Sequence, residues 1–359
     1  MSSRQVTALV DLDAISSNFN LVRHHAPNSC AMAIMKADAY GHGAIRVAQS
    51  LPAADAFGVA RVSEAVELRE AGIGQPICLL EGVNDREELN LASIFELQVV
   101  IHDQSQLELL ERSGARRKIW LKIDTGMGRL GFSPETVPEV LASLGKQTLL
   151  GVMTHLSEAS DPSSTKTDLQ LMRLQEVIGN LEQPGAKTLS IANSAGILGH
   201  AASLADWVRP GLMLYGATPF DDLKPMDELH PAMTFSAPVI AVHAVKAGES
   251  VGYGGIFTAA EDTRVAVIAA GYADGYPREI AQGAPILLHG ERRKLVGNVS
   301  MDMICVELEP SDVVQPSDRA VLWGEGLAIE EIAALCGTIP YTLMTGVSSR
   351  VYRHYRVSN

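Results

Sequence analysis

The first part of the chain consists of short apolar runs, each followed by a stretch with helical spacing of its apolar residues. The first run, AMAIM, ends immediately before Lys36, and the helical pattern behind it begins at Ala44. Continuous apolar runs of this length are typical of strands buried on both faces. Because buried strands alternate with helices, the pattern predicts a parallel sheet, and eight such runs favour a closed (β/α)8 barrel. The runs are residues 31–35, 56–60, 76–80, 97–101, 118–123, 149–153, 188–192 and 207–214.

Polar residues between the runs predict where helices begin and end. Ser63 can cap a helix that ends at Gly72, and Asp103, with Gln106 three positions on, opens a helix over residues 107–112 before Gly114. An open doubly wound sheet is the alternative to the barrel. No GxGxxG motif follows an early strand, which favours the barrel.

The hydrophobic period changes after a polar stretch at residues 221–225, which we interpret as a linker. Beyond it apolar residues alternate with a period of two, as expected for a mainly β domain. The sequence therefore predicts a barrel over residues 1–223 and a C-terminal β domain over residues 224–359. Residues 1–12 precede the first barrel strand and are free to pair with the second domain. The clearest alternating segments are residues 238–245, 264–269, 285–288 and 303–308.

Composition excludes several classes of protein. A formal net charge of -13 argues against binding of nucleic acid by phosphate neutralisation. The chain shows no hydrophobic signal core and no apolar run of transmembrane length, so we expect a soluble cytoplasmic protein that does not bind membranes. The cysteines lie far apart, form no CxxC pair and are expected to be reduced thiols: Cys30, Cys78, Cys305 and Cys336.

Polar residues at the ends of several predicted strands are candidates for chemistry, because active sites of (β/α)8 barrels lie at the carboxyl ends of the strands. Lys36 follows the first run, where burial lowers the pKa of an ammonium and makes a Schiff-base amine accessible, including one for pyridoxal phosphate. Each residue alone has an ordinary structural interpretation, but Arg209 in an apolar strand needs a partner. The other rim residues are Arg129, His155, Asn193, Ser194 and Gly211.

Six motifs occur in order across both predicted domains: KADAYGHG, KIDTGMGRLGF, WVRPGLMLYG, VGYGG, AGYADGYPR and SMDM. Together they resemble the alanine racemases, pyridoxal phosphate enzymes of fold type III with an N-terminal barrel and a C-terminal β domain. The resemblance implies interconversion of L-alanine and D-alanine. It also implies two bases on opposite faces of the substrate Cα, Lys36, which holds the cofactor, and Tyr253.

The resemblance assigns further roles to motif residues. Arg209 would face the pyridine nitrogen of the cofactor, and His155 would link Arg209 to Tyr253. Lys122 matches a position that is carboxylated in many relatives, where the carbamate orients Arg129. No metal is implied. The remaining implied roles are cofactor contacts for Tyr40, Ser194, Gly211 and Leu212, substrate contacts for Arg129 and Met301, and support of the site by Tyr272 and Asp302.

Assembly and substrate range are also implied. Relatives form a two-fold dimer in which each site takes Lys36 from one subunit and Tyr253 and Met301 from the other. One departure concerns Ser349, which stands where many relatives have a tyrosine that touches the cofactor phosphate and narrows the pocket. The breadth of the amino-acid substrate is therefore left open by the sequence.

Other functions compete with alanine racemisation. A racemase of serine or a bulkier amino acid shares the architecture, as does a fold-type III decarboxylase, which would place a cysteine and an aspartate where Tyr253 stands. A non-enzymatic pyridoxal phosphate carrier would lack the β domain. A cofactor-free Schiff-base aldolase would have no use for an arginine beside a pyridine.

Overall fold

The N-terminal half folds into the predicted barrel. The structure is a computed structural model that describes residues 5–114, 116–183 and 185–357. Eight strands pair in parallel around a closed cylinder, and β2 meets β9 to complete it. The barrel prediction is therefore confirmed. Its strands are β2 (Cys30–Ile34), β3 (Ala56–Val59), β4 (Ile77–Leu79), β5 (Gln98–Ile101), β6 (Lys118–Lys122), β7 (Thr148–Met153), β8 (Leu189–Ser190) and β9 (Trp207–Val208).

A separate apolar cluster lies inside the barrel. Its members include Met32, Cys78, Trp120 and Met153, and all are buried. Because alternate residues of a strand face the same side, Lys122 points into the barrel above Trp120. The filled interior leaves the carboxyl ends of the strands as the place for a site.

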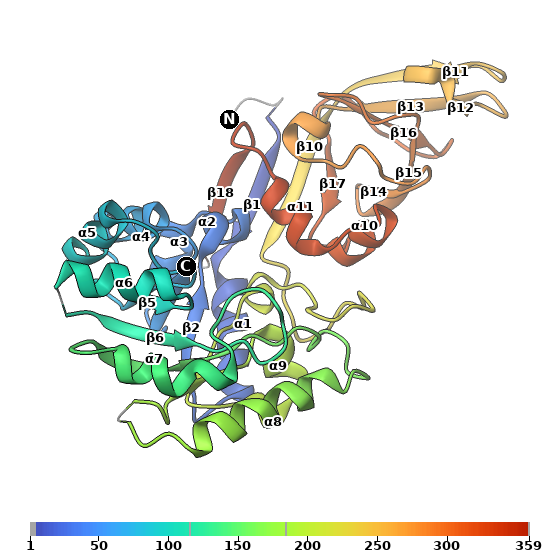
Figure 1. Cartoon of the computed structure of the whole chain (residues 1–359). Coiled ribbons are helices and arrows are strands. Elements are labelled where there is room, and N and C mark those ends of the chain that lie inside the picture. The colour runs from blue at the N-terminus through green and yellow to red at the C-terminus, as the bar shows by residue number, and fades with distance from the viewer. Residues whose placement is uncertain (1–4, 115, 184, 358–359) are drawn as a thin grey trace.

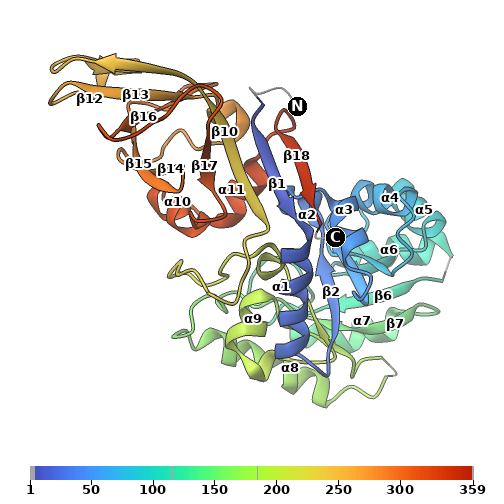
Figure 2. The ribbon, with the colours of Figure 1, turned by 180° about the vertical axis from the view of Figure 1, so that it is seen from behind.

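Helices surround the barrel, as Figures 1 and 2 show from opposite sides. The prediction for Asp103 is confirmed, since its side chain accepts the Ser105 N–H at 2.9 Å and Gly114 ends the helix in the left-handed conformation. The prediction for Ser63 was wrong by two residues, because Arg61 precedes the first turn. The helices are α1 (Leu12–His25), α2 (Lys36–Gly41), α3 (Ala44–Ser50), α4 (Val62–Glu70), α5 (Arg86–Ile94), α6 (Gln104–Ser113), α7 (Val137–Ser143), α8 (Lys166–Gly179) and α9 (Ser194–Gly199).

The eighth predicted strand is shorter than its apolar run. β9 ends at Val208, and the apolar residues after Gly211 form the 3-10 helix η3 (Leu212–Tyr215). Pro210 has no N–H for a strand ladder, so the chain leaves the sheet there. The run stays apolar because η3 is buried, with the Tyr215 hydroxyl donating to the Ile34 carbonyl at 2.7 Å.

The C-terminal half forms an eight-stranded sheet that β1 (Thr7–Asp11) joins from the start of the chain. β1 runs antiparallel to β10 and parallel to β18. The strand order is β13-β16-β15-β14-β17-β10-β1-β18, and β13 also pairs with β10. The other strands are β10 (Met233–Val245), β13 (Thr263–Ile268), β14 (Pro285–Leu288), β15 (Glu291–Val296), β16 (Ile304–Leu308), β17 (Arg319–Trp323) and β18 (Tyr352–Arg356).

A hairpin and two helices complete the second domain. The hairpin pairs β11 (Ser250–Val251) with β12 (Phe257–Thr258) and lies at the end of the domain far from the barrel (Figure 1). The helices α10 (Ile329–Leu335) and α11 (Pro340–Gly346) lie on the barrel side, and α11 packs against α2. None of the helices in the described ranges combines the length and apolar character that crossing a membrane requires.

The second domain is fixed directly to the segment that follows Lys36. A Cβ added to Gly41 would lie 2.3 Å from the Met344 carbonyl oxygen, so only glycine fits beneath α11. Arg353 donates from Nε to the Gly41 carbonyl at 2.7 Å. The barrel rim around Lys36 is therefore shaped partly by the β domain.

Candidate active site

A cavity of about 430 Å³ opens at the carboxyl ends of the barrel strands. Of the residues implicated by the sequence, it brings together Lys36, Tyr40, Lys122, Arg129, His155, Asn193, Ser194, Arg209 and Gly211. Leu212 is buried next to Gly211. The lining also includes Glu81, Ile339 and Tyr341, for which the sequence carried no signal.

The chain leaves β2 through a left-handed turn directly after Lys36. The φ angles of Ala37, Asp38, Ala39 and Tyr40 are 53°, 54°, 53° and 53°. This conformation is unfavourable for L-residues by about 1–2 kcal/mol each, so the surrounding contacts must hold it. The turn folds the chain back so that Tyr40, four residues after Lys36, lines the same cavity.

Local hydrogen bonds stabilise this turn. The Ala44 N–H donates to the Asp38 carboxylate at 2.7 Å, and the Gly43 N–H donates to the Asp38 carbonyl at 3.0 Å. His42 is fully buried, and its Nδ1 lies 3.0 Å and 2.9 Å from the carbonyls of Ala39 and Tyr40. Since carbonyls only accept, Nδ1 carries the proton. Burial lowers the pKa of His42 to about 4, so the ring is neutral.

Lys36 enters the cavity with a weakened affinity for its proton. Burial is the main cause that lowers the pKa of its ammonium, and the positive charge of Arg129 lowers it further. The carboxylates of Glu81 and Glu64 oppose this effect. A neutral amine, the form that reacts with a carbonyl, is thus more accessible here than on an exposed lysine.

Arg209 is buried at the base of the cavity and bonded to three oxygen acceptors. It donates to the Ser190 hydroxyl at 2.6 Å and to the carbonyls of Thr154 and Ile191 at 2.6 Å and 3.0 Å. Its Nη2 lies 3.3 Å from Nδ1 of His155. Burial first, and then the charge of Arg209, hold the pKa of His155 well below its ordinary value. His155 is therefore a neutral ring that accepts from Arg209 through Nδ1 and carries its proton on Nε2.

Replacing Arg209 with methionine is expected to destabilise the fold, because three buried oxygen acceptors lose their donor. We expect the free energy of unfolding to fall by about 2–4 kcal/mol. Urea denaturation followed by circular dichroism measures the change. Arg116→Met, at an exposed arginine, is the matched control and should change stability by less than about 0.5 kcal/mol. Equal losses in the two variants would contradict the assigned network.

Lys122 adds another cation to the floor of the cavity. Its side chain is buried, and burial lowers its pKa to about 8, helped by the charges of Arg209, Arg129 and Lys36. Glu81 is the acidic side chain in the lining. The excess of cationic groups suits the cavity to ligands that carry phosphate or carboxylate.

A loop built around Asp124 presents Arg129 to the cavity. The Asp124 carboxylate accepts the N–H groups of Gly126, Met127 and Gly128 at 2.9, 2.8 and 2.8 Å. Burial alone would raise the pKa of Asp124, but these bonds outweigh it and lower the pKa. A Cβ on Gly131 would lie 2.5 Å from the Asp124 backbone nitrogen, so glycine is required where the loop closes. The loop is thus a fixed support for Arg129.

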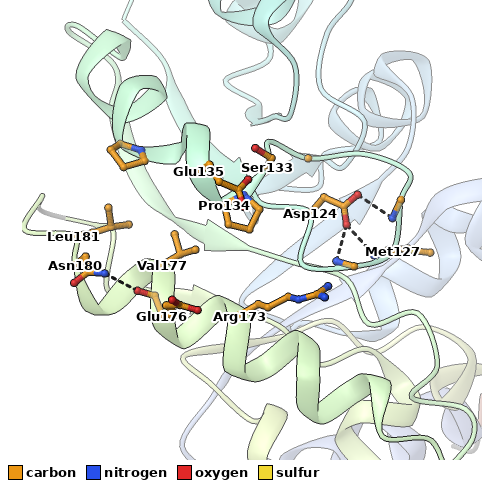
Figure 3. Close-up of a pocket in the computed structure, with 14 residues that line it drawn as sticks. Asp124, Met127, Ser133, Pro134, Glu135, Arg173, Glu176, Val177, Asn180 and Leu181 are labelled. Atoms are coloured by element: carbon orange, nitrogen blue, oxygen red, sulfur yellow. Dashed lines mark hydrogen bonds between the residues drawn. The ribbon is translucent and has the colours of Figure 1, made fainter.

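A second cavity, of about 860 Å³, lies behind this loop against α7 and α8 (Figure 3). Arg173 points toward the loop and donates to the Thr125 carbonyl at 3.0 Å. Asp124 lines this cavity through the carboxylate that already binds the loop backbone. None of the predicted site residues lines it, so the smaller cavity is the one with convergent chemistry.

A cradle for a phosphate group lies on one side of the smaller cavity. The Ser194 hydroxyl accepts the N–H groups of Gly211 and Met213 at 2.9 Å and 3.3 Å. A Cβ on Gly211 would lie 2.7 Å from the Tyr40 hydroxyl, so glycine is required for Tyr40 to approach the backbone here. The two hydroxyls of Tyr40 and Ser194 and the amine of Lys36, which line one cavity, fit a phosphorylated aldehyde such as pyridoxal phosphate.

The predicted residues of the second domain lie apart from this cavity within one chain. Tyr253, on η4 (Tyr253–Gly255) of the hairpin, is 76% exposed, and Met301 is 53% exposed. Tyr272 lies on η5 (Tyr272–Asp274), and Asp302 accepts a hydrogen bond from Arg350 at 2.8 Å. None of these four lines the cavity. Of the described residues with His, Cys, Asp or Glu side chains, no three form a group that could hold a metal ion.

Comparisons with known proteins agree with this arrangement. Residues 10–219 match the family described as "Alanine racemase, N-terminal domain", and residues 232–355 match "Alanine racemase, C-terminal domain". The alanine racemase of Nitrosomonas eutropha is 43% identical over 355 residues, 97% of this chain and 98% of the relative. That of Coxiella burnetii strain RSA 331 is 41% identical over 359 residues, with coverage of 97% and 98%.

Solved structures give the same result. The biosynthetic alanine racemase from Pseudomonas aeruginosa superimposes with a TM-score of 0.94 at 39% identity, covering 99% of this chain and 100% of that one. The alanine racemase from Bartonella henselae, solved with covalently bound pyridoxal phosphate, gives a TM-score of 0.90 at 28% identity, with coverage of 98% and 99%. Since both domains match over nearly their whole length, this chain belongs to the alanine racemase family.

Proposed function

We propose that this protein is a pyridoxal phosphate-dependent racemase that interconverts L-alanine and D-alanine. The observation that carries the proposal is the cavity in which Lys36, the Ser194–Gly211 cradle and buried Arg209 converge, in a chain of this family. Bound pyridoxal phosphate would supply an aldehyde for the substrate amine and withdraw electrons from the Cα–H bond of the substrate. The residues of the chain then orient the substrate and move its proton.

Each role follows from the position of the side chain. Lys36 would hold the cofactor and exchange a proton at one face of Cα, a role that its lowered pKa, caused mainly by burial, favours. Arg129 binds the substrate carboxylate from its fixed loop, and Tyr40, Ser194, Gly211 and Leu212 contact the cofactor phosphate. Arg209, which lines the cavity, would hold its positive charge beside the pyridine nitrogen of the bound cofactor and would disfavour protonation of the ring. His155, already bonded to Arg209, is placed to continue that contact toward Tyr253.

Tyr253 and Met301 complete the site only in a dimer. Tyr253, Met301, Met303 and Ile256 are exposed large apolar side chains on the β domain, and such groups mark interaction surfaces. Asn298 donates to the Tyr253 carbonyl at 2.7 Å, which joins the hairpin to the strand connection that bears Met301. We propose an isologous homodimer in which this surface of each subunit covers the cavity of the other, with Tyr272 and Asp302 supporting it.

Residues 1–223 act in this proposal as the cofactor domain, apart from β1, which pairs in the sheet of the β domain, and residues 224–359 act as the domain that covers the partner's site. We place the enzyme in the cytoplasm, because Cys30, Cys78, Cys305 and Cys336 are free thiols of the kind that a reducing compartment preserves.

The substrate range is the second functional question. Ser349 is exposed and lies outside the cavity lining, so no large side chain from this position narrows the pocket. Racemisation of serine is therefore the alternative that a specific observation favours. The relatives described above carry the name alanine racemase, which supports alanine as the main substrate.

One assay tests the proposal. The cofactor-loaded enzyme is incubated with L-alanine in deuterated water, and the product is resolved by chiral chromatography and mass analysis. We expect D-alanine that carries deuterium at Cα, and slower conversion of L-serine. Release of carbon dioxide without the D-enantiomer would instead identify a decarboxylase and reject the proposal.

Lys122 is expected to react with carbon dioxide to form a carbamate. With a pKa of about 8, part of the Lys122 population is a neutral amine near neutral pH, and only the neutral amine reacts with carbon dioxide. The carbamate would place a negative charge beside Arg129 and Arg209. Mass analysis of the intact peptide under bicarbonate should show the added carbon dioxide at Lys122 and not at exposed Lys118, the matched control. An unmodified Lys122 with full activity after removal of carbon dioxide would refute this expectation.

A further inference from the structure

The carboxylate of Glu64 joins the residue after Lys36 to the neighbouring strand end. Its Oε1 accepts the Ala37 N–H at 2.6 Å. Its Oε2 accepts the N–H groups of Ala60 and Arg61 at 2.8 Å and 3.0 Å. Glu64 is the third residue of α4, so its bond to Arg61 is an ordinary helix cap. The bond to Ala37 is additional and reaches the active site.

This bond meets a need that the left-handed turn creates. Ala37 opens the turn, and the first N–H groups of a helical turn have no partner within it. An alanine also has no intrinsic preference for a φ of 53°. The Glu64 carboxylate, held on another helix, supplies the acceptor that the Ala37 N–H lacks within the turn.

We propose that Glu64 is a positioning residue for Lys36: by holding the Ala37 N–H against the end of β3, it sets the direction of the lysine side chain toward the cofactor and substrate. The inference rests on the proposed function, because it assigns Lys36 as the reacting amine. Glu64 does not line the cavity and acts through the backbone. Its negative charge also raises the pKa of Lys36, against the effects of burial and Arg129.

The chain offers a matched control on the next helix. Glu88 is the third residue of α5, and its Oε2 accepts the Asn84 N–H at 2.8 Å. It therefore performs the same capping on its own strand–helix connection. Substituting Glu88 measures the loss of a cap alone.

The experiment compares Glu64→Gln with Glu88→Gln in the full chain. A glutamine has one acceptor oxygen, so at position 64 it can serve Ala37 or the Ala60–Arg61 pair but not both. Two readouts are used. One is the pH dependence of acetylation of Lys36 by acetic anhydride in the cofactor-free protein, followed by mass spectrometry, and the other is steady-state racemisation by the holoenzyme.

We expect Glu64→Gln to lower the apparent pKa of Lys36 and to reduce kcat by about 10- to 100-fold, with KM changed less than about twofold, because a small misplacement of a reacting group has effects of this size. Glu88→Gln should change neither the apparent pKa of Lys36 nor kcat. Both variants should lower Tm, because each removes a helix cap. Glu64→Asp keeps the charge but is one methylene shorter. Glu64→Asp should therefore reduce kcat while it shifts the Lys36 pKa less than Glu64→Gln does. It replaces Glu64→Gln in the experiment if that variant folds poorly.

Two outcomes separate the possible failures. If Glu64 and Glu88 variants have the same Lys36 reactivity and the same kcat, Glu64 is only a helix cap and the inference is wrong. If the wild-type protein does not racemise alanine, the proposed function fails. The acetylation rate of Lys36 in Glu64→Asp, which keeps the charge, then still decides whether Glu64 positions Lys36: a rate equal to that of the wild type would contradict the inference.

Discussion

Replacing Lys36 with alanine is expected to remove racemisation in both directions, by more than about 10³-fold, because one residue supplies both the covalent tether for the cofactor and one of the two bases. The amine lies in the cavity with Arg129 and the Ser194–Gly211 cradle, and the other lysine of the lining, Lys122, lies on a different strand, β6. The rates from L-alanine and from D-alanine are measured separately.

The cofactor readout distinguishes loss of the tether from loss of folding. After borohydride treatment, the wild-type protein should carry pyridoxal phosphate on the peptide that contains Lys36, and the Lys36→Ala protein should carry none. Lys118→Ala removes an exposed lysine at the start of β6, the end away from the cavity. It should leave both the rate of racemisation and the amount of bound cofactor unchanged. A reduced adduct on another lysine of the Lys36→Ala protein would show that the assignment is wrong.

The barrel could be predicted because its signal is local and repeated. Each strand is buried on both faces, so the sequence shows it as a continuous apolar run. The prediction is weakest where apolar residues are buried in an element other than a strand. The apolar run from Trp207 predicts a strand through Leu214, but Pro210 stops the ladder and η3 packs against the end of β2. In the β domain, β15 lies outside the clearest alternating segments, because Arg292, Arg293 and Lys294 conceal its alternation.

The candidate site could be predicted in part, through the rule that barrel sites lie where strands end. That rule gathers Lys36, His155, Ser194 and Arg209, all of which line one cavity. It could not reveal the left-handed turn at Ala37–Tyr40, since the segment Ala-Asp-Ala-Tyr contains no glycine to signal a positive φ. Tyr341 was missed for a related reason: it reaches the cavity through packing of α11 on α2, a long-range contact without a sequence pattern.

The cavity of one chain contains only some of the residues that the proposed mechanism requires, because the two domains hold them far apart. The β11–β12 hairpin, which bears Tyr253, lies at the far end of the β domain, whereas α2, which begins at Lys36, lies beside the barrel (Figure 1). The hairpin backbone is bonded to Asn298 and is fixed to its own domain. A second copy of the chain is therefore the simplest source of the tyrosine in each site.

Mixing Lys36→Ala and Tyr253→Phe chains is expected to restore activity that neither variant has alone. In a mixed dimer with shared sites, one site receives both altered residues and the other receives an intact Lys36 and an intact Tyr253. Random pairing makes about half of the dimers mixed, so roughly a quarter of wild-type activity should return after the two chains are unfolded together and refolded. Each variant refolded alone under the same conditions provides the baseline. If the mixture gives no more than the sum of the two baselines, each site is built within one chain and the shared-site dimer is wrong.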